Sequence, residues 1–314
     1  MNTPSNGVPE PAIDARGIAP ATLSPTRPLY WSIRRELWDN RSIYIAPLAA
    51  SAVVLFGFTI GAAITLPNRM ASLSALDPAG QQAVIAMPFS IAACIIILAS
   101  YIVGAFYCVD ALHSERRDRS ILFWKSLPVS DLTTVLSKAG IPLVVLPLIA
   151  FAVSLATQLA MLLLSTAILL ASGAGAATLW TRLPLFEMSL VMVYGLTVHA
   201  LWFAPIYGWL LLVSVWARRT PVLWAALPWV AISVVERVAF DSSHFASFLR
   251  YRVIGAMARA FTVDPQRADV GFIDQVSQLT PARFLGTPGL WIGLAFAAAC
   301  LAAAVRLRRN REPI

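Results

Sequence analysis

The most prominent feature of the sequence is a series of six long apolar runs separated by more polar stretches. The runs cover residues 43–66, 84–109, 141–171, 185–216, 222–240 and 290–307. Each is close to or above the roughly 20 apolar residues that a helix needs to cross a bilayer. The pattern therefore predicts an all-α integral membrane protein with six transmembrane helices.

A short amphipathic stretch precedes the first apolar run. Residues 1–28 are rich in Pro, Ala, Thr and Ser with no apolar period, and we expect them to form a disordered cytoplasmic tail. In residues 29–42 the apolar positions Leu29, Ile33 and Leu37 recur at four-residue spacing, which predicts a helix. The interfacial residues of this helix are Trp31, Arg34, Arg35 and Trp38. They favour a helix at the membrane interface; a helix packed on protein is the alternative, and both descriptions can hold together.

The connection between the second and third runs, residues 110–140, is too polar to cross a bilayer. A charge cluster at residues 114–119 is followed by a compact apolar patch. Pro128 then breaks the chain, and Ser130 is placed to cap a second short helix. We interpret the segment as a hairpin at the membrane face that another protein binds. The alternative is an amphipathic segment that lies on anionic lipid.

A second long connection, residues 241–289, precedes the last apolar run. Aromatic and apolar side chains recur at helical spacing between Phe245 and Phe261, interleaved with arginines. The pattern predicts an amphipathic helix, a polar turn around Asp264 and Pro265, and a second short helix near residues 272–279. We expect this segment to lie near the outer interface or to cap the membrane part from outside.

The overall composition also indicates a membrane protein. The chain is 58% hydrophobic and 13% charged, with a mean hydropathy of +0.72, whereas soluble chains average about 25% charged residues. Sixteen of the 24 lysines and arginines fall in the amino-terminal region, the 110–140 segment, the fourth connection and the carboxyl end. By the positive-inside rule both termini, including the tail at residues 309–314, and the 110–140 segment are predicted to be cytoplasmic.

The sequence lacks the common catalytic motifs. It contains no GxSxG, HExxH or GxxxxGK[ST] pattern, so it has no recognisable nucleophile elbow, zinc helix or phosphate loop. The three histidines lie far apart in the sequence, and the three cysteines show no CxxC spacing, so no metal site is predicted. We expect a non-catalytic chain with no cofactor of its own. If ATP is used, another subunit supplies the site.

Polar side chains inside a span are candidates for function because their burial in lipid costs free energy. Gln158 and His199 fall in the middle of the third and fourth runs. An interhelical hydrogen bond is the structural alternative to contact with a substrate for both. Trp202 and Trp209 lie seven residues apart beside His199. They either pack and anchor the helix or line an aromatic translocation surface.

Three further charged residues, Glu187, Glu236 and Arg237, lie near the predicted outer ends of the fourth and fifth runs. We interpret them as members of structural ion pairs, with Arg182 as one possible partner. A proton relay is the alternative, but no chain of further carboxylates continues inward from them.

Several stretches resemble the ABC-2 type permease family, the membrane subunits of type V ABC exporters. They are the amphipathic helix at the start, ERRDRSILFWKSLPVS in the 110–140 segment, HALWFAPIYGWLLLVSVWARRTPVLWAALP at residues 199–228, and LTPARFLGTPGLW before the last run. The resemblance covers residues 30–308 and implies one six-helix permease domain at residues 29–308. Many larger relatives carry a re-entrant helix pair where residues 241–289 stand here.

The resemblance implies a partner and a coupling site. Two copies of a separate ATPase subunit, which carries ATP and Mg, would bind two copies of this permease in a bacterial inner membrane. The charged coupling contacts would be Glu115, Arg116, Arg117 and Asp118, and the apolar knob would be Ile121, Leu122, Phe123, Trp124 and Leu127. The helix from Trp31 to Trp38 would be the second contact with the ATPase.

The implied function is export of an amphiphilic substrate, either lipid-like, a peptide or a drug, out of the cytoplasm or the inner leaflet. An alternative is an ABC-2-like protein that couples ATP hydrolysis to membrane or cofactor assembly without moving a soluble substrate. A standalone membrane enzyme or channel is the third interpretation, and the absence of catalytic motifs argues against the enzyme. Partners of the chain would be lipid and protein, with no nucleic acid.

Overall fold

The computed structural model describes residues 26–118, 129–262 and 275–310, and these residues form helices joined by short turns. Six of the helices are long and apolar enough to cross a membrane, which confirms the prediction of six candidate spans. They are α2 (Ser42–Ser72), α3 (Pro78–Asp110), α7 (Leu146–Ala171), α9 (Leu185–Trp216), α10 (Pro221–Phe240) and α13 (Pro288–Asn310).

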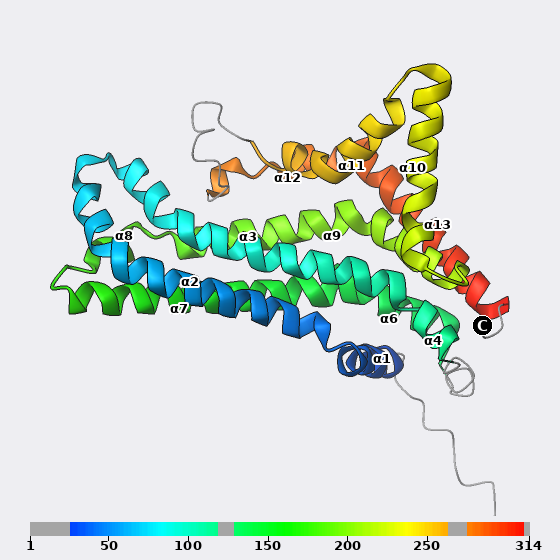
Figure 1. Cartoon of the computed structure of the whole chain (residues 1–314), viewed down its shortest axis with the longest axis horizontal. Helices are drawn as coiled ribbons and strands as arrows, with labels where there is room; N and C mark the ends of the chain where they lie inside the picture. The colour runs from blue at the N-terminus through cyan, green and yellow to red at the C-terminus, as the bar shows by residue number, and fades with distance from the viewer. Residues whose placement is uncertain (1–25, 119–128, 263–274, 311–314) are drawn as a thin grey trace, which may run out of the picture.

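Four of these helices, α2, α3, α7 and α9, run side by side along the long axis of the molecule, as Figure 1 shows. At one end of this bundle Phe89 of α3 and Met161 and Leu169 of α7 are buried in a common apolar cluster. α13 packs along α9, and Gly208 allows the close approach. A Cβ at Gly208 would lie 3.2 Å from the backbone of Ala297 in α13, which is the role small residues play between membrane helices.

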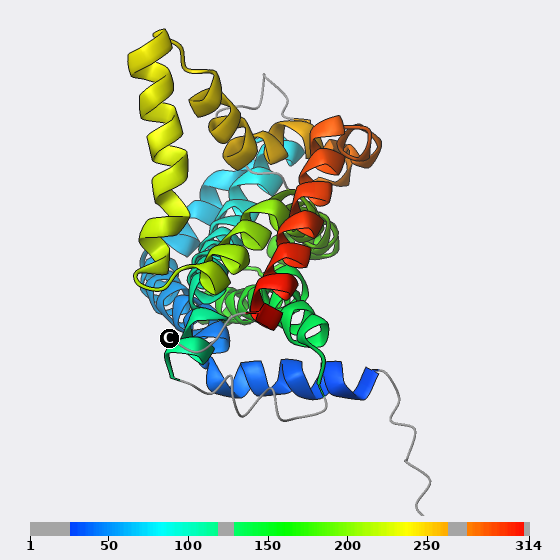
Figure 2. The same ribbon diagram turned by 90° about the vertical axis from the view of Figure 1, so that its right-hand side faces the viewer.

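The amino-terminal helix and the carboxyl-terminal turn meet at the same end of the bundle. α1 (Thr26–Asp39) lies across this end, crosswise to the long helices, as Figure 2 shows. The short helices α4 (His113–Arg117) and α6 (Asp131–Gly140) and the last turn of α13 lie beside it. The opposite end carries the 3-10 turn Leu73–Ala75 and α8 (Ala177–Arg182). The described parts of the amino-terminal region, the 110–140 segment and the carboxyl end therefore share one end of the molecule.

The second helix of the 110–140 segment begins where its cap predicted. Ser130 Oγ accepts a hydrogen bond from the backbone N–H of Thr133 at 3.1 Å, and α6 starts at the next residue. α6 does not end before the third span. It continues through a π-helical turn, Ile141–Val145, directly into α7. Pro142 lies in this π-helical turn, and the helix continues past the proline without ending.

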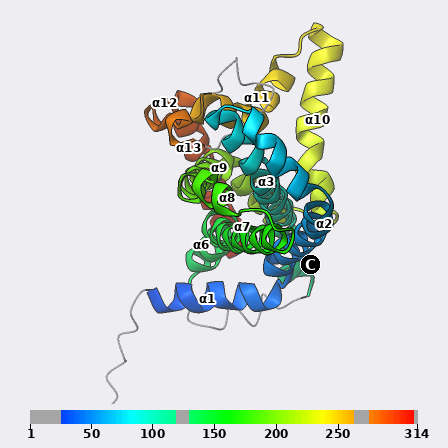
Figure 3. The ribbon, with the colours of Figure 1, turned by 90° about the vertical axis from the view of Figure 1, so that its left-hand side faces the viewer.

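α10 differs from the other long helices. It rises crosswise to α2, α3, α7 and α9 (Figures 1 and 3), and Ala225 is its one buried residue. Tryptophans connect its first turns to α9: Trp224 packs edge-on against Trp216, and Trp229 packs edge-on against Trp209. These contacts fit the packing role predicted for the tryptophans of this region.

The helix predicted in residues 241–289 is α11 (His244–Ala260), and it packs against the middle of α9. Its residues Ala256 and Ala260 share a buried cluster with Val198 and Trp202 of α9. The 3-10 turn Val276–Gln278 and α12 (Pro281–Leu285) follow. Two backbone hydrogen bonds join both sides of the segment, from Thr262 to Gln278 and from Thr280 to Ala260. The polar turn predicted at Asp264 and Pro265 lies outside the described residues.

Candidate functional site

A buried ionic network occupies the end of the bundle where α1, α4, α6 and α13 meet. Its centre is Glu115, which is 5% exposed. Oε1 of Glu115 lies 3.1 Å from Nη2 of Arg35 and 3.2 Å from Nζ of Lys138, and Oε2 lies 3.0 Å from Nη2 of Arg308. One carboxylate of α4 thus contacts cations from α1, α6 and α13.

A second carboxylate, Glu36 of α1, extends the network and is 2% exposed. Its Oε1 accepts a hydrogen bond from Nζ of Lys138 at 2.8 Å, and its Oε2 accepts one from the hydroxyl of Tyr107 in α3 at 2.7 Å. Nη1 of Arg308 also donates to Oδ1 of Asp131 at 2.9 Å. Removing one member of such a buried group costs about 3–5 kcal/mol, because it leaves an uncompensated charge.

The corner between α3 and α4 is fastened to the end of α9. The hydroxyl oxygen of Ser214 accepts hydrogen bonds from the backbone N–H groups of Leu112 and His113, both at 2.9 Å. Nη1 of Arg116 donates to the carbonyl of Val215 at 2.6 Å. Arginine bound to the last carbonyls of a helix satisfies groups that the helix itself leaves unpaired. The charged segment and α9 therefore form one unit at this end.

The predicted charged coupling residues fall into two pairs. Glu115 and Arg116 are buried within the chain. Arg117 and Asp118 are exposed, and Nε of Arg117 lies 3.0 Å from Oδ1 of Asp118. The predicted apolar knob, Ile121, Leu122, Phe123, Trp124 and Leu127, lies outside the described residues. At this end the exposed pair, but not the buried one, lies on the surface of the described part of the chain.

The two faces of α1 have different surroundings. Ile33 and Leu37 pack against the apolar cluster that contains Ile43, and Arg35 faces Glu115. Trp31 and Trp38 are 56% and 64% exposed, and the guanidinium of Arg34 lies over both indole rings. One face of the helix is therefore packed on protein, while the other presents an aromatic and basic surface.

The predicted polar residues within the spans have partners inside the chain. Nε2 of Gln158 donates to the carbonyl of Phe89 at 3.3 Å, joining α7 to α3. The ring of His199 is stacked between Tyr101 of α3 and Phe203, and its Nε2 lies 2.9 Å from the hydroxyl of Tyr207. Oε1 of Gln158 is buried without a hydrogen-bond partner among the described residues, so only part of this amide is satisfied.

Trp202 is completely buried, and its indole N–H donates to the backbone carbonyl of Arg252 in α11 at 2.7 Å. It holds α11 against α9 at this point. Trp209, for which packing and an aromatic translocation surface were the two alternatives, donates to the carbonyl of Ala225 in α10 at 3.1 Å. The two tryptophans thus position two different helices on α9.

Glu236 binds the start of α11. Its Oε1 accepts from the hydroxyl of Ser242 and the backbone N–H of His244, and its Oε2 accepts from the backbone N–H of Phe245, all within 2.8–2.9 Å. Its neighbour Arg237 lies 3.5 Å from Asp241 in an exposed pair. Glu187 is exposed, and among the ion pairs of the described residues none joins these three to one another or to Arg182.

Sequence reasoning did not identify Glu36, Tyr107, Asp131, Lys138 and Arg308 as members of a network. One local feature of the sequence could have identified Glu36 as a buried residue. Glu36 shares a helix face with Ile33 and Leu37, because residues three and four apart are neighbours on a helix. A carboxylate within an apolar face indicates a buried partner.

The chain was compared with models of known protein families, with curated proteins and with solved structures, and none of them matched.

Proposed function

We propose that the chain is the transmembrane permease subunit of an ATP-driven exporter that moves an amphiphilic substrate out of the cytoplasm or the inner leaflet. The energy comes from a separate ATPase subunit that binds the segment from Asp110 to Lys138. ATP and Mg are held by that partner, and two copies of each subunit form the transporter. The observation that carries the proposal is the buried network around Glu115.

The network suits the transmission of movement. A force applied to the exposed part of the 110–138 segment acts on α4, whose Glu115 contacts cations of α1, α6 and α13. α6 continues without interruption into α7. Ser214 and Arg116 fasten the same corner to α9. Displacement at the membrane face is thus carried by several long helices together, as expected for rigid packed elements that switch between two arrangements.

Every transporter that alternates between two states has the same energetic requirement. Alternation between inward-open and outward-open states needs a free-energy difference between those states, and ATP binding to the partner supplies it. In this proposal Arg117 and Asp118 contact the ATPase, together with the apolar residues 121–127. Glu115 and Arg116 hold the segment in place from inside. The exposed face of α1, with Trp31 and Trp38, is the second contact.

The proposal is tested by association in the native membrane. We expect that replacing Phe123 and Trp124 with alanine removes the ATPase from the purified complex while the permease remains inserted. The matched control replaces two exposed aromatic residues, Trp180 of α8 and Phe186 in the first turn of α9, and should retain the ATPase. Equal association of both double variants with the ATPase would contradict the assignment of the apolar knob.

A further inference from the structure

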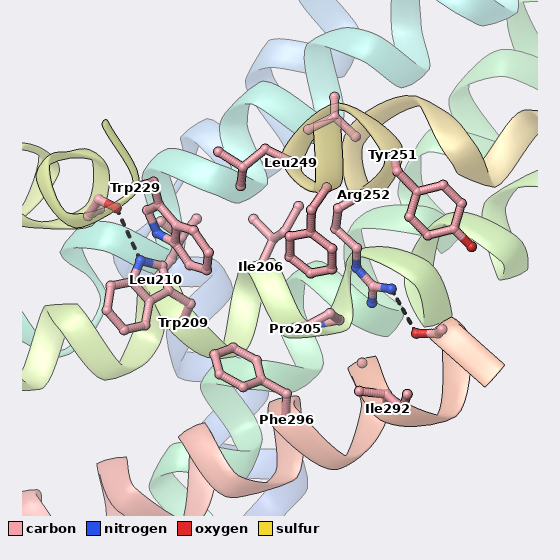
Figure 4. A pocket seen from close by; sticks show the side chains of 15 residues that line it. Pro205, Ile206, Trp209, Leu210, Trp229, Leu249, Tyr251, Arg252, Ile292 and Phe296 are labelled. Atoms are coloured by element: carbon pink, nitrogen blue, oxygen red, sulfur yellow. Dashed lines mark hydrogen bonds between the residues drawn. The ribbon is translucent and has the colours of Figure 1, made fainter. Parts of the chain in front are cut away.

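A pocket of about 450 Å³ lies between α9, α10, α11 and α13, and apolar atoms form almost all of its surface. Its volume is typical of small-molecule sites, which span roughly 300–1,000 Å³. Figure 4 shows the lining side chains, among them Trp209 of α9, Trp229 of α10 and Phe296 of α13. Because one chain supplies all of these walls, the pocket is formed without a partner subunit.

The polar groups near the pocket are directed into the protein. The indole N–H of Trp209 donates to the carbonyl of Ala225 at 3.1 Å. Arg252 is the one charged side chain among the described lining residues. Its Nη1 donates to the carbonyl of Gly289 at 3.1 Å, and its Nη2 is buried against Gly293. The pocket therefore offers a ligand no accessible charge, and a charged ligand would lose its hydration there without gaining a partner.

Aromatic rings form a large part of the lining. They come from all four helices, and they are Trp209, Trp229, Phe248, Tyr251 and Phe296. The rings of Trp209 and Trp229 pack edge-on with their centroids 5.4 Å apart. Aromatic rings gain free energy from stacked or edge-on neighbours beyond the gain from buried area. A rigid ring system also loses less conformational entropy on binding than a flexible acyl chain does. The lining therefore favours a ring-bearing ligand over a lipid chain.

Some of the lining side chains are exposed at the surface of the molecule. Phe248, Val253 and Ile292 are 53%, 56% and 70% exposed. Three of the four helices around the pocket are candidate membrane spans, and exposed apolar side chains between such spans contact the lipid tails. A hydrophobic molecule dissolved in the membrane therefore reaches the pocket from the side. An unfilled apolar cavity forfeits packing contacts, and an apolar ligand restores them.

We propose that this pocket binds an uncharged, ring-bearing hydrophobic molecule that enters from the membrane hydrocarbon. Burial of the ligand's apolar area supplies the affinity, and contacts with the aromatic side chains favour its rings. Binding requires neither an ATPase nor transport, so this proposal does not rest on the proposed function and is tested on this chain alone.

The test uses the purified full chain in nanodiscs of dioleoyl phosphatidylcholine. The probe is azidopyrene, an uncharged ring system that attaches to nearby residues on illumination. We expect the labelling to saturate, to be prevented by unlabelled pyrene, and to map by mass spectrometry to peptides that contain Trp209, Phe248 or Phe296. The acyl chains of the nanodisc are in large excess, so saturable labelling shows that the pocket prefers the rings. Labelling that rises in proportion to the probe and spreads over all exposed helices overturns the proposal.

The charge of the ligand is tested with three unlabelled competitors that share one ring system. They are pyrene, pyrenebutyrate and pyrenemethyl-trimethylammonium, compared at equal concentrations in the nanodisc. We expect pyrene to compete about tenfold or more better than either charged form, because the pocket offers no partner for a charge. Equal competition by the anionic or the cationic form overturns the proposal.

A pair of matched variants tests the location. Ile292→Trp adds bulk to the lining and should weaken saturable labelling about tenfold. Ile64→Trp on α2 is the control, because the same substitution is made at a side chain of nearly equal exposure, 69% against 70%, outside the pocket. It should leave the labelling unchanged, and equal labelling of the two variants overturns the proposal. If Ile292→Trp fails to fold, the competition among the three pyrenes in the wild-type chain decides.

Discussion

Nζ of Lys138 lies 2.8 Å from Oε1 of Glu36, although the two residues are 102 positions apart in the sequence. Lys138 is on α6 and Glu36 on α1, and both are almost completely buried. The same ammonium group is 3.2 Å from Glu115. Lys138 therefore bridges two carboxylates, one from the helix that lies across the end of the bundle and one from the charged segment.

Replacing Lys138 with methionine should destabilise the protein strongly. Methionine retains much of the apolar stem but leaves Glu36 and Glu115 without this shared cation. Loss of one partner from a buried ionic group costs about 3–5 kcal/mol. The measurement is the melting temperature of the purified chain in mild detergent. The control is Arg117→Ala. This substitution removes a cation that pairs with Asp118 at the surface, and it should leave the melting temperature unchanged.

The double variant Glu36→Gln with Lys138→Met gives a further check. It removes the cation together with one of its carboxylates, so its loss of stability should be smaller than the sum of the two single losses. Additive losses, or a Lys138→Met protein as stable as the wild type, would show that the network does not hold this end together.

Ser214→Ala should loosen the corner between α3 and α4. The substitution leaves the backbone N–H groups of Leu112 and His113 without their acceptor, and an unsatisfied buried group costs about 1–3 kcal/mol. Hydrogen exchange should become faster at these two amides. Ser189→Ala is the control on the same helix, because the hydroxyl of Ser189 binds only a carbonyl of its own helix. Unchanged exchange at Leu112 and His113 would contradict the proposed fastening.

Glu236→Gln should reduce stability more than it reduces transport per folded molecule. The carboxylate accepts three hydrogen bonds at the start of α11, whereas the amide of glutamine offers one acceptor oxygen and presents donors to the remaining N–H groups. A lower melting temperature is the expected result. Glu187→Gln, at an exposed position of α9, is the matched control. A normal melting temperature combined with lost transport would instead assign Glu236 a direct part in the mechanism.

The parts of the fold that could be predicted are those encoded locally. An apolar run of about 20 residues identifies a span by itself, and Ser130 identifies the start of α6 because a cap acts within three residues. The continuation of α6 into α7 was not predicted, because the π-helical turn at Pro142 has no reliable sequence signal. The position of α10 was also not predicted. It depends on a few contacts with α9, which the local sequence does not encode.

The candidate site depended on residues far apart in the sequence. Glu115 stands in a run of charges that is typical of an exposed surface, yet its partners Arg35 and Arg308 are 80 and 193 positions away. Only the packing of α1 and α13 brings them together. Arg252 is similar, because its surroundings come from α9 and α13. Charge patterns therefore did not separate the buried members of the segment from its exposed ones.

If an ATPase subunit drives this chain, as we propose, the tagged chain should retain that subunit when it is purified from its native membrane under mild solubilisation. Partners would be identified, and their copy number determined, by mass spectrometry. We expect an ATP-binding subunit with a phosphate loop, present in the same number of copies as this chain. Recovery of the chain without any ATPase would contradict the account, and the segment from Asp110 to Lys138 would then not be a coupling element.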